Sequence, residues 1–200
     1  MTKRILISLA IIGAVSAIVV GATTAYFSDT ETLSGNTFTA GTLDLTVDDE
    51  NPYTEHITVD NIKPGWARQW VFWLKNTGNL DGKLSIEFSD IINNDNGLTE
   101  PESDVDSTGG DGEGELGEYL EAASTLRHWV GGQIVDQPEP FSWTKLNDLG
   151  GQTFTSYTLA ADEADAQQFI LDLKLPLDVG NIVQSDSVEF DIIFKLEQVH

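Results

Sequence analysis

The feature that most constrains this chain is an alternation of apolar and polar residues with a period of two. In the segment KLSIEF, which begins at Lys83, every second residue is apolar. Such alternation is typical of antiparallel strands that have one buried and one solvated face. It therefore predicts a chain built from half-buried strands. The segments with this pattern are residues 42–47, 56–60, 66–74, 83–88, 169–175 and 188–196.

Turn-forming residues separate these segments, as at Lys63-Pro64-Gly65 and Asp81-Gly82. Many short strands with Gly, Pro and Asn between them indicate two antiparallel sheets packed face to face. The sequence therefore predicts an all-β fold, a jelly-roll-like antiparallel β-sandwich. We expect a short helix at Glu115–Arg127 and one further helical turn at Ala160–Ala166.

The first 25 residues have the pattern of a secretory signal. Lys3 and Arg4 precede an uncharged run, Ile5–Ala22, and small residues follow it. We expect cleavage between Ala25 and Tyr26. The run of 18 residues is also near the lower limit for spanning a bilayer, so a retained anchor is the alternative. In either case the remainder is exported, and after cleavage we expect a secreted, extracellular protein without stable membrane insertion.

The chain then divides into a signal peptide (1–25), an N-terminal arm (26–40) and a β-sandwich domain (41–200). It contains no cysteine, so disulfides do not stabilise it outside the cell. Loss of the two positive charges in the signal takes the net charge from −23 to −25. Such acidity argues against binding to nucleic acid or to an anionic membrane surface, because both require basic patches.

One acidic segment, residues 93–117, interrupts the strand pattern and reads as a long loop insertion. Asp104, Asp106, Thr108 and Glu115 fall at positions 1, 3, 5 and 12 of a loop spaced like a Ca²⁺-binding EF-hand. Asp111 stands at position 8 in place of an apolar residue, and no helix is expected before Asp104, so a complete EF-hand is not predicted. Two interpretations stay open: a looser Ca²⁺ site formed by these five residues, or a solvated, disordered loop.

Signs of catalysis are few. The three histidines, His56, His128 and His200, are far apart, and neither a His-Glu-x-x-His nor a Gly-x-Ser-x-Gly motif occurs. We therefore do not expect an enzyme, although a triad assembled from scattered residues stays open because triads are defined by geometry. Trp66 and Trp70 are expected in the core. Trp73, on the other face of the same strand, is expected either in the core as well or covering an interface, and sugar binding by an exposed strip of tryptophans is the functional alternative.

The residues that follow the cleavage point are strand-forming rather than linker-like. Thr, Tyr, Phe and Leu favour strands, while Gly35-Asn36 and Gly41 are flexible points. A strand-forming arm on a flexible joint pairs either with its own sheet or with a sheet edge of another molecule. Repeated head to tail, the second arrangement produces a filament.

Several motifs carry a resemblance to a known family: Ala25-Tyr26-Phe27-Ser28-Asp29, Phe38-Thr39-Ala40-Gly41-Thr42-Leu43-Asp44-Leu45, Ile62-Lys63-Pro64-Gly65, Lys75-Asn76-Thr77-Gly78, Asn96–Ser103, and the closing segment from Leu175-Pro176 to Glu197-Gln198. With these motifs the chain resembles the TasA/camelysin family, exported proteins of bacteria and archaea that form biofilm-matrix fibres or surface pili. The N-terminal half is the more specific part of the match.

The resemblance implies a jelly-roll subunit whose N-terminal arm inserts into the next subunit and completes its sheet. It maps the arm onto residues from Tyr26 to about Thr39, with Tyr26, Phe27, Leu33 and Phe38 as the inserted side chains. It also implies processing by a dedicated signal peptidase. The peptidase activity in the family's name is not carried over, because the sequence has no zinc motif.

The sequence thus predicts the structural subunit of an extracellular filament, a pilus or a biofilm-matrix fibre, whose partner is a second copy of itself. Two alternatives stay open. One is a secreted metal-dependent peptidase of camelysin type, and the other is a monomeric surface-binding module.

Overall fold

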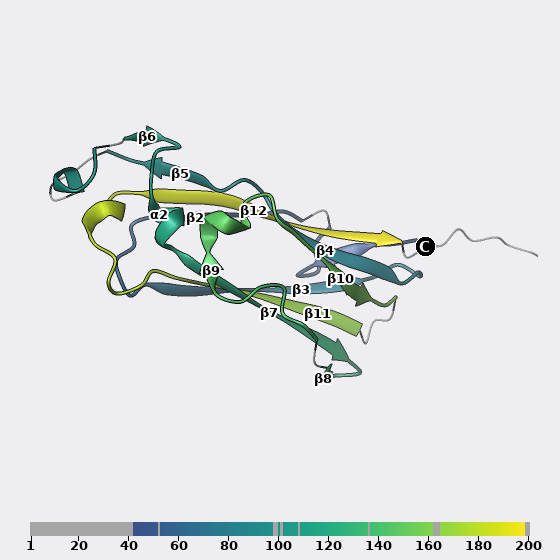
Figure 1. The fold of residues 1–200 in the computed structure, drawn as a ribbon. Coiled ribbons are helices and arrows are strands. Elements are labelled where there is room, and N and C mark those ends of the chain that lie inside the picture. The colour runs from purple at the N-terminus through teal and green to yellow at the C-terminus, as the bar shows by residue number, and fades with distance from the viewer. Residues whose placement is uncertain are drawn as a thin grey trace, which may run out of the picture. The chain divides into compact units, whose positions relative to one another are not determined.

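Two antiparallel sheets face each other in the part of the chain that a computed structural model describes (Figure 1). The described residues are 42–51, 53–97, 100, 102–107, 109–135, 137–161 and 165–198. Residues Gly41–His200 form one compact unit. The predicted cleavage site and the arm residues Tyr26, Phe27, Leu33 and Phe38 lie outside the described residues.

The first sheet follows the order β1-β3-β11-β7-β8, and β9 also pairs with β7. Its longest ladders join β11 to β3 and to β7, so β11 is the centre of this layer. Its strands are β1 (Leu45–Val47), β3 (Ala67–Asn76), β7 (Glu121–Val130), β8 (Gln133–Val135), β9 (Thr144–Lys145) and β11 (Asp165–Lys174).

The second sheet follows the order β10-β4-β12-β5-β6, and β2 also pairs with β12. Because β12 contacts β4, β5 and β2, it organises this layer as β11 organises the other. The strands are β2 (Glu55–Val59), β4 (Gly82–Phe88), β5 (Ile92–Asp95), β6 (Gly110–Asp111), β10 (Thr153–Leu159) and β12 (Ser187–Gln198). The short helices are η1 (Glu102–Asp104), α2 (Leu116–Tyr119), η2 (Leu146–Leu149) and η3 (Asn181–Val183).

The core fills the space between the sheets with every second side chain of the long strands. Phe169 of β11 stacks on Phe72 of β3 at 6.2 Å, and Phe88 of β4 stacks on Phe190 of β12 at 6.0 Å. Each fully buried side chain of this size contributes roughly 1.5–3 kcal/mol through loss of contact with water. The alternation read from the sequence is therefore the pattern of the core, and the predicted all-β sandwich is confirmed.

Trp66, which precedes β3, and the two tryptophans of β3 divide as the alternation predicts. Trp66 and Trp70 are half-buried and pack against the core. Trp73 lies on the outer face of the first sheet, where its ring is 5.6 Å from that of Trp129 in β7.

The predicted helix at Glu115–Arg127 is wrong beyond Tyr119. Only Leu116–Tyr119 is helical, and Glu121–Val130 is a strand that pairs along its whole length with β11. From Glu121 to Leu126 its side chains alternate between half-buried and buried, so the segment has the period of a strand despite its helix-forming Glu-Ala-Ala start. Pairing with the central strand outweighs that local preference.

Two further predictions need correction. The helical turn expected at Ala160–Ala166 is wrong at its end, because Asp165 and Ala166 already pair with β7 as part of β11. The acidic segment 93–117 is not a plain loop, since it contains the end of β5, η1, β6 and the start of α2, and β6 pairs with β5. Among the described residues, no helix is long and apolar enough to cross a membrane.

Candidate functional site: an open edge between the two sheets

One half of β12 has a strand on only one of its two sides. Ser89, which follows β4, donates its N–H to the carbonyl of Asp191 at 3.0 Å. Because backbone groups of successive residues in an antiparallel strand point to opposite sides, Phe194 and Leu196 direct theirs away from β4. On that side β2 extends only as far as Glu55, opposite Ile192. Within the described residues, no strand pairs with Phe194 and Leu196 on this side.

The facing sheet ends in a similarly open strand. Asp44 accepts the N–H of Thr77 at 2.8 Å, and Thr42 accepts the N–H of Asn79 at 2.9 Å, so these residues turn their backbone groups toward β3 and its following turn. Leu43 and Leu45 therefore direct theirs outward, at the edge of the first sheet. The unpaired stretch of this edge ends at Val47, whose N–H and carbonyl both hydrogen-bond to the backbone of Glu50 at 2.9 Å.

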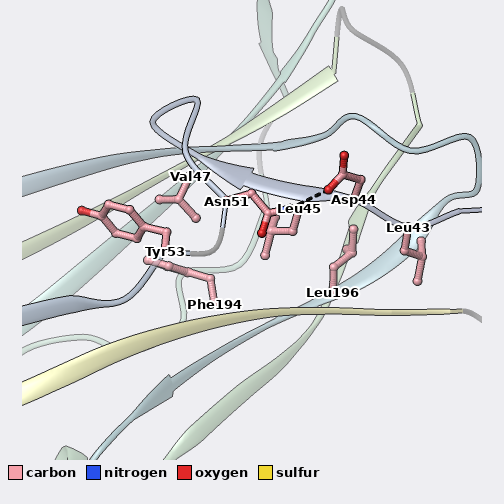
Figure 2. A pocket seen from close by; sticks show the side chains of 8 residues that line it. All are labelled: Leu43, Asp44, Leu45, Val47, Asn51, Tyr53, Phe194 and Leu196. Atoms are coloured by element: carbon pink, nitrogen blue, oxygen red, sulfur yellow. Dashed lines mark hydrogen bonds between the residues drawn. The ribbon is translucent and has the colours of Figure 1, made fainter.

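A groove of about 300 Å³ lies between these two edges, and Figure 2 shows the side chains that line it. Five of the eight are aliphatic or phenyl groups, from β12 on one wall and from β1 and its lead-in on the other. The polar groups at the rim bond to neighbours: Asn51 donates to Asp44 Oδ1 at 2.6 Å, and Tyr53 donates to Glu55 Oε2 at 2.6 Å. The lining residues are Leu43, Asp44, Leu45, Val47, Asn51, Tyr53, Phe194 and Leu196.

This combination has a specific capability. An extended peptide in the groove can hydrogen-bond to an open strand through its backbone while every second side chain packs against the aliphatic and phenyl side chains that line it. The sequence alone did not reveal these residues as a site. Their alternation predicts strands, but only the sheet order shows that β2 ends before β12 does.

The five residues of the predicted Ca²⁺ loop are only partly described. Asp104 is exposed at the end of η1, and Asp106 bonds through Oδ1 to the N–H of Ser107. Glu115 precedes α2 and donates its N–H to Asp186 Oδ2 at 2.7 Å. Thr108 and the side chain of Asp111 lie outside the description. The loop site therefore stays a prediction.

A family model described as camelysin metallo-endopeptidase matches residues 2–105, just over half of the chain. The chain belongs to this family. The match confirms the resemblance and includes the wall of the groove from Leu43 to Tyr53, whereas Phe194 and Leu196 lie beyond it. No curated protein matches the chain.

The description of the camelysin family implies a catalytic metal, for which histidines are the usual ligands. Catalytic zinc takes three protein ligands, mainly His, Glu or Asp, around one point. His56 Nδ1 lies 2.7 Å from Asp191 Oδ1 in the second sheet, and His128 Nε2 lies 2.9 Å from Asp165 Oδ2 in the first. In the part of the chain that the structure covers, no group of three or more His, Cys, Asp or Glu side chains could hold a metal ion. The described residues do not fit a zinc centre, and we derive no hydrolytic step from them.

Proposed function

We propose that the chain is the structural subunit of an extracellular filament and that its N-terminal arm, residues 26–40, occupies the groove of the next subunit. The observation that carries this proposal is the pair of open strand edges on either side of a groove whose lining side chains are mostly aliphatic or phenyl groups. The cleaved N-terminal signal would bring the protein outside the cell, where the filament, a pilus or biofilm-matrix fibre, forms.

The arm has the chemistry that the groove requires. An extended strand bonding to Phe194 and Leu196 gives partners to both N–H groups and both carbonyls, each bond contributing about 0.5–1.5 kcal/mol. In an extended chain Phe27 and Leu33 project from the same side. Burial of each such side chain adds roughly 1.5–3 kcal/mol. Together these contributions support a stable contact between subunits.

The arm is also long enough to connect two molecules. Fifteen extended residues span roughly 50 Å. An arm that leaves one subunit and enters another makes a heterologous contact, in which donor and acceptor surfaces differ. Such contacts repeat without closing, so the same interaction that joins two copies extends the filament.

The test uses Gly41–His200, which is a compact unit by itself. We expect the mature chain to form filaments in negative-stain electron micrographs and the unit from Gly41 to stay monomeric. A synthetic peptide of residues 26–40 should bind this unit one to one, whereas a peptide with Phe27, Leu33 and Phe38 replaced by Ser should not. Filaments formed by the shortened unit, or equal binding of the two peptides, would exclude the proposal.

The family's printed description favours a second candidate, a secreted metallo-endopeptidase. It predicts chelator-sensitive cleavage of protein substrates by the purified chain. Hydrolysis that persists in filament-free protein and disappears with chelator would support it. Because assembly and hydrolysis are measured separately, either result stands without the other.

A further inference from the structure

Trp143 differs from the other tryptophans of the chain in its exposure to solvent. It is 50% exposed, whereas the other four tryptophans are half-buried. Tryptophan is highly buried on average, so an exposed indole on a folded domain requires an explanation. The residue lies directly before β9, where β9 pairs with the start of β7 at the edge of the first sheet.

The backbone on either side of Trp143 is fixed to the sandwich. Ser124 of β7 donates its N–H to the carbonyl of Phe141 at 3.2 Å and accepts the N–H of Phe141 on Oγ at 3.0 Å. The Phe141 ring packs against the core, and Thr144 pairs with β7. The exposed indole therefore stands on a rigid support, which lowers the entropy cost of binding a ligand there.

A hollow of about 390 Å³ lies beside Trp143 on the outer face of the first sheet. Pockets for small molecules have volumes of about 300–1,000 Å³. The pairing of β3 with β11 places Ala67 opposite Lys174 and Gln69 opposite Asp172. These four side chains line the hollow together with Trp143, and Ala67 leaves room because it contributes only a methyl group.

The polar groups in the hollow have capacity for further hydrogen bonds. Gln69 Nε2 donates to Asp172 Oδ1 at 2.7 Å, which leaves Asp172 Oδ2 and Gln69 Oε1 as acceptors for a ligand. Lys174 Nζ lies 2.9 Å from Glu121 Oε2 and 3.9 Å from the centre of the Trp143 ring. An ammonium group has three N–H donors, so Lys174 can also donate to a ligand. Donors and acceptors thus surround one side of an aromatic ring.

The charges around the hollow favour an uncharged ligand. Glu121 offsets the charge of Lys174, and Asp172 adds a negative charge that repels an anion. Lys174 already lies over the Trp143 ring, so it repels a second cation from that ring. A second copy of the chain, with its net charge of −23, would bring further acids to this place. The ligand is therefore small, neutral and able to form several hydrogen bonds.

We propose that the hollow beside Trp143 binds a neutral hexopyranose unit of a glycan. The carbon-bound hydrogens on one face of a pyranose ring form an apolar surface that packs against the exposed indole. The hydroxyl groups lie around the edge of the sugar, where Asp172 Oδ2 and Gln69 Oε1 accept their hydrogens and Lys174 donates to an oxygen. Aromatic contact and hydrogen bonds thus act on the same sugar unit.

The sugar site is separate from the groove between the sheets. Ala67 begins β3 and Asn76 ends it, and β1 of the groove pairs at the Asn76 end. The two sites are therefore roughly 30 Å apart along β3. Glycan binding does not depend on occupation of the groove, so the two proposals succeed or fail separately.

The test is saturation-transfer NMR of the whole mature chain with glucose, galactose, mannose and N-acetylglucosamine. We expect transfer to at least one of these sugars, strongest at the protons of one ring face, with a Kd on the order of 1 mM. Glucuronate is the anionic control and should receive less transfer than the best uncharged sugar. No transfer to any of the four sugars, or stronger transfer to glucuronate, overturns the proposal.

Single substitutions locate the site. Trp143→Ala should abolish transfer, and its melting temperature should stay within about 2 °C of the parent because the side chain is at the surface. Asp172→Asn replaces an accepting oxygen by a donor and should weaken binding roughly tenfold. Trp73→Phe, at a tryptophan on the same outer face but outside the hollow, is the matched control and should bind normally.

Sedimentation and electron microscopy of Trp143→Ala complete the test. The variant should assemble as the parent does, because the indole contacts a sugar and not a second copy of the chain. Equal saturation transfer in the parent and in Trp143→Ala would contradict the site. A changed state of assembly in Trp143→Ala would show that the indole covers a protein interface, and would also overturn the proposal.

Discussion

Tyr53 donates its phenolic hydrogen to Glu55 Oε2 at 2.6 Å, where the chain leaves the groove and enters β2. The phenol ring packs edge-on against Phe72 at 6.3 Å. This pair therefore joins the wall of the groove to the core, and the phenol must stay neutral to donate its proton.

The first prediction concerns alkaline pH. Burial, and then the hydrogen bond and charge of Glu55, raise the pKa of Tyr53 above its ordinary value of about 10. Since the folded-state pKa is the higher one, the stability that this contributes is complete below the unfolded pKa and is lost as pH rises above about 10. Tyr53→Phe should lose less stability than the parent between pH 9 and 11. Urea unfolding at each pH, with phenolate absorbance, measures this; identical pH profiles would contradict it.

A second prediction concerns the lead-in to β1. A Cβ on Gly78 would lie 2.2 Å from the carbonyl oxygen of Thr42, which is backbone and cannot rotate away. Gly78→Ala should displace Thr42 and destabilise the fold by about 1–3 kcal/mol. Gly180→Ala is the control, because nothing lies within 4 Å of its Cβ position. Chemical denaturation compares the two, and equal stabilities would show that β1 does not depend on this contact.

Core packing gives a third prediction. Phe169 is fully buried and contacts both Phe72 and Phe194. Phe169→Ala should lower the free energy of unfolding by about 3–5 kcal/mol. Leu177 is 83% exposed, so Leu177→Ala should change stability by less than about 0.5 kcal/mol. A similar loss in both variants would place the core elsewhere.

The strands could be predicted from the sequence wherever one face of a strand is buried and the other is exposed to solvent. That condition holds for β4 and for β12, whose sequences alternate between apolar and polar residues. The condition is not visible in β7, because the residues that face the core there include the small Ala122 and Ser124. Its Glu-Ala-Ala start also has a high helix propensity. The short strands β6, β8 and β9 have two or three residues each, too few to show a period.

The candidate site and the buried acids were less accessible to sequence reasoning. The groove depends on where β2 ends relative to β12, which is a matter of strand pairing between segments more than 100 residues apart. The buried Glu102 is held by Ser185, again across the chain, through a hydrogen bond of 2.6 Å from Ser185 Oγ to Glu102 Oε2. Loop spacing drew attention to Asp104 and Asp106, whereas the acids that the fold buries among the described residues are Asp95, Glu102, Asp165 and Asp186. Burial, which decides between solvated and functional acids, is a property of the tertiary structure.

The most direct measurement of the central claim is disulfide formation between two different single-cysteine variants, since the chain has no cysteine of its own. Asn51→Cys places a thiol at the rim of the groove, and Leu33→Cys places one in the arm. Strand donation predicts that mixing the two mature variants and assembling them gives a mixed disulfide dimer, which Phe27→Ser in the arm chain should diminish. A link that forms only when both cysteines are in one chain would show that the arm fills its own groove, and would contradict the account.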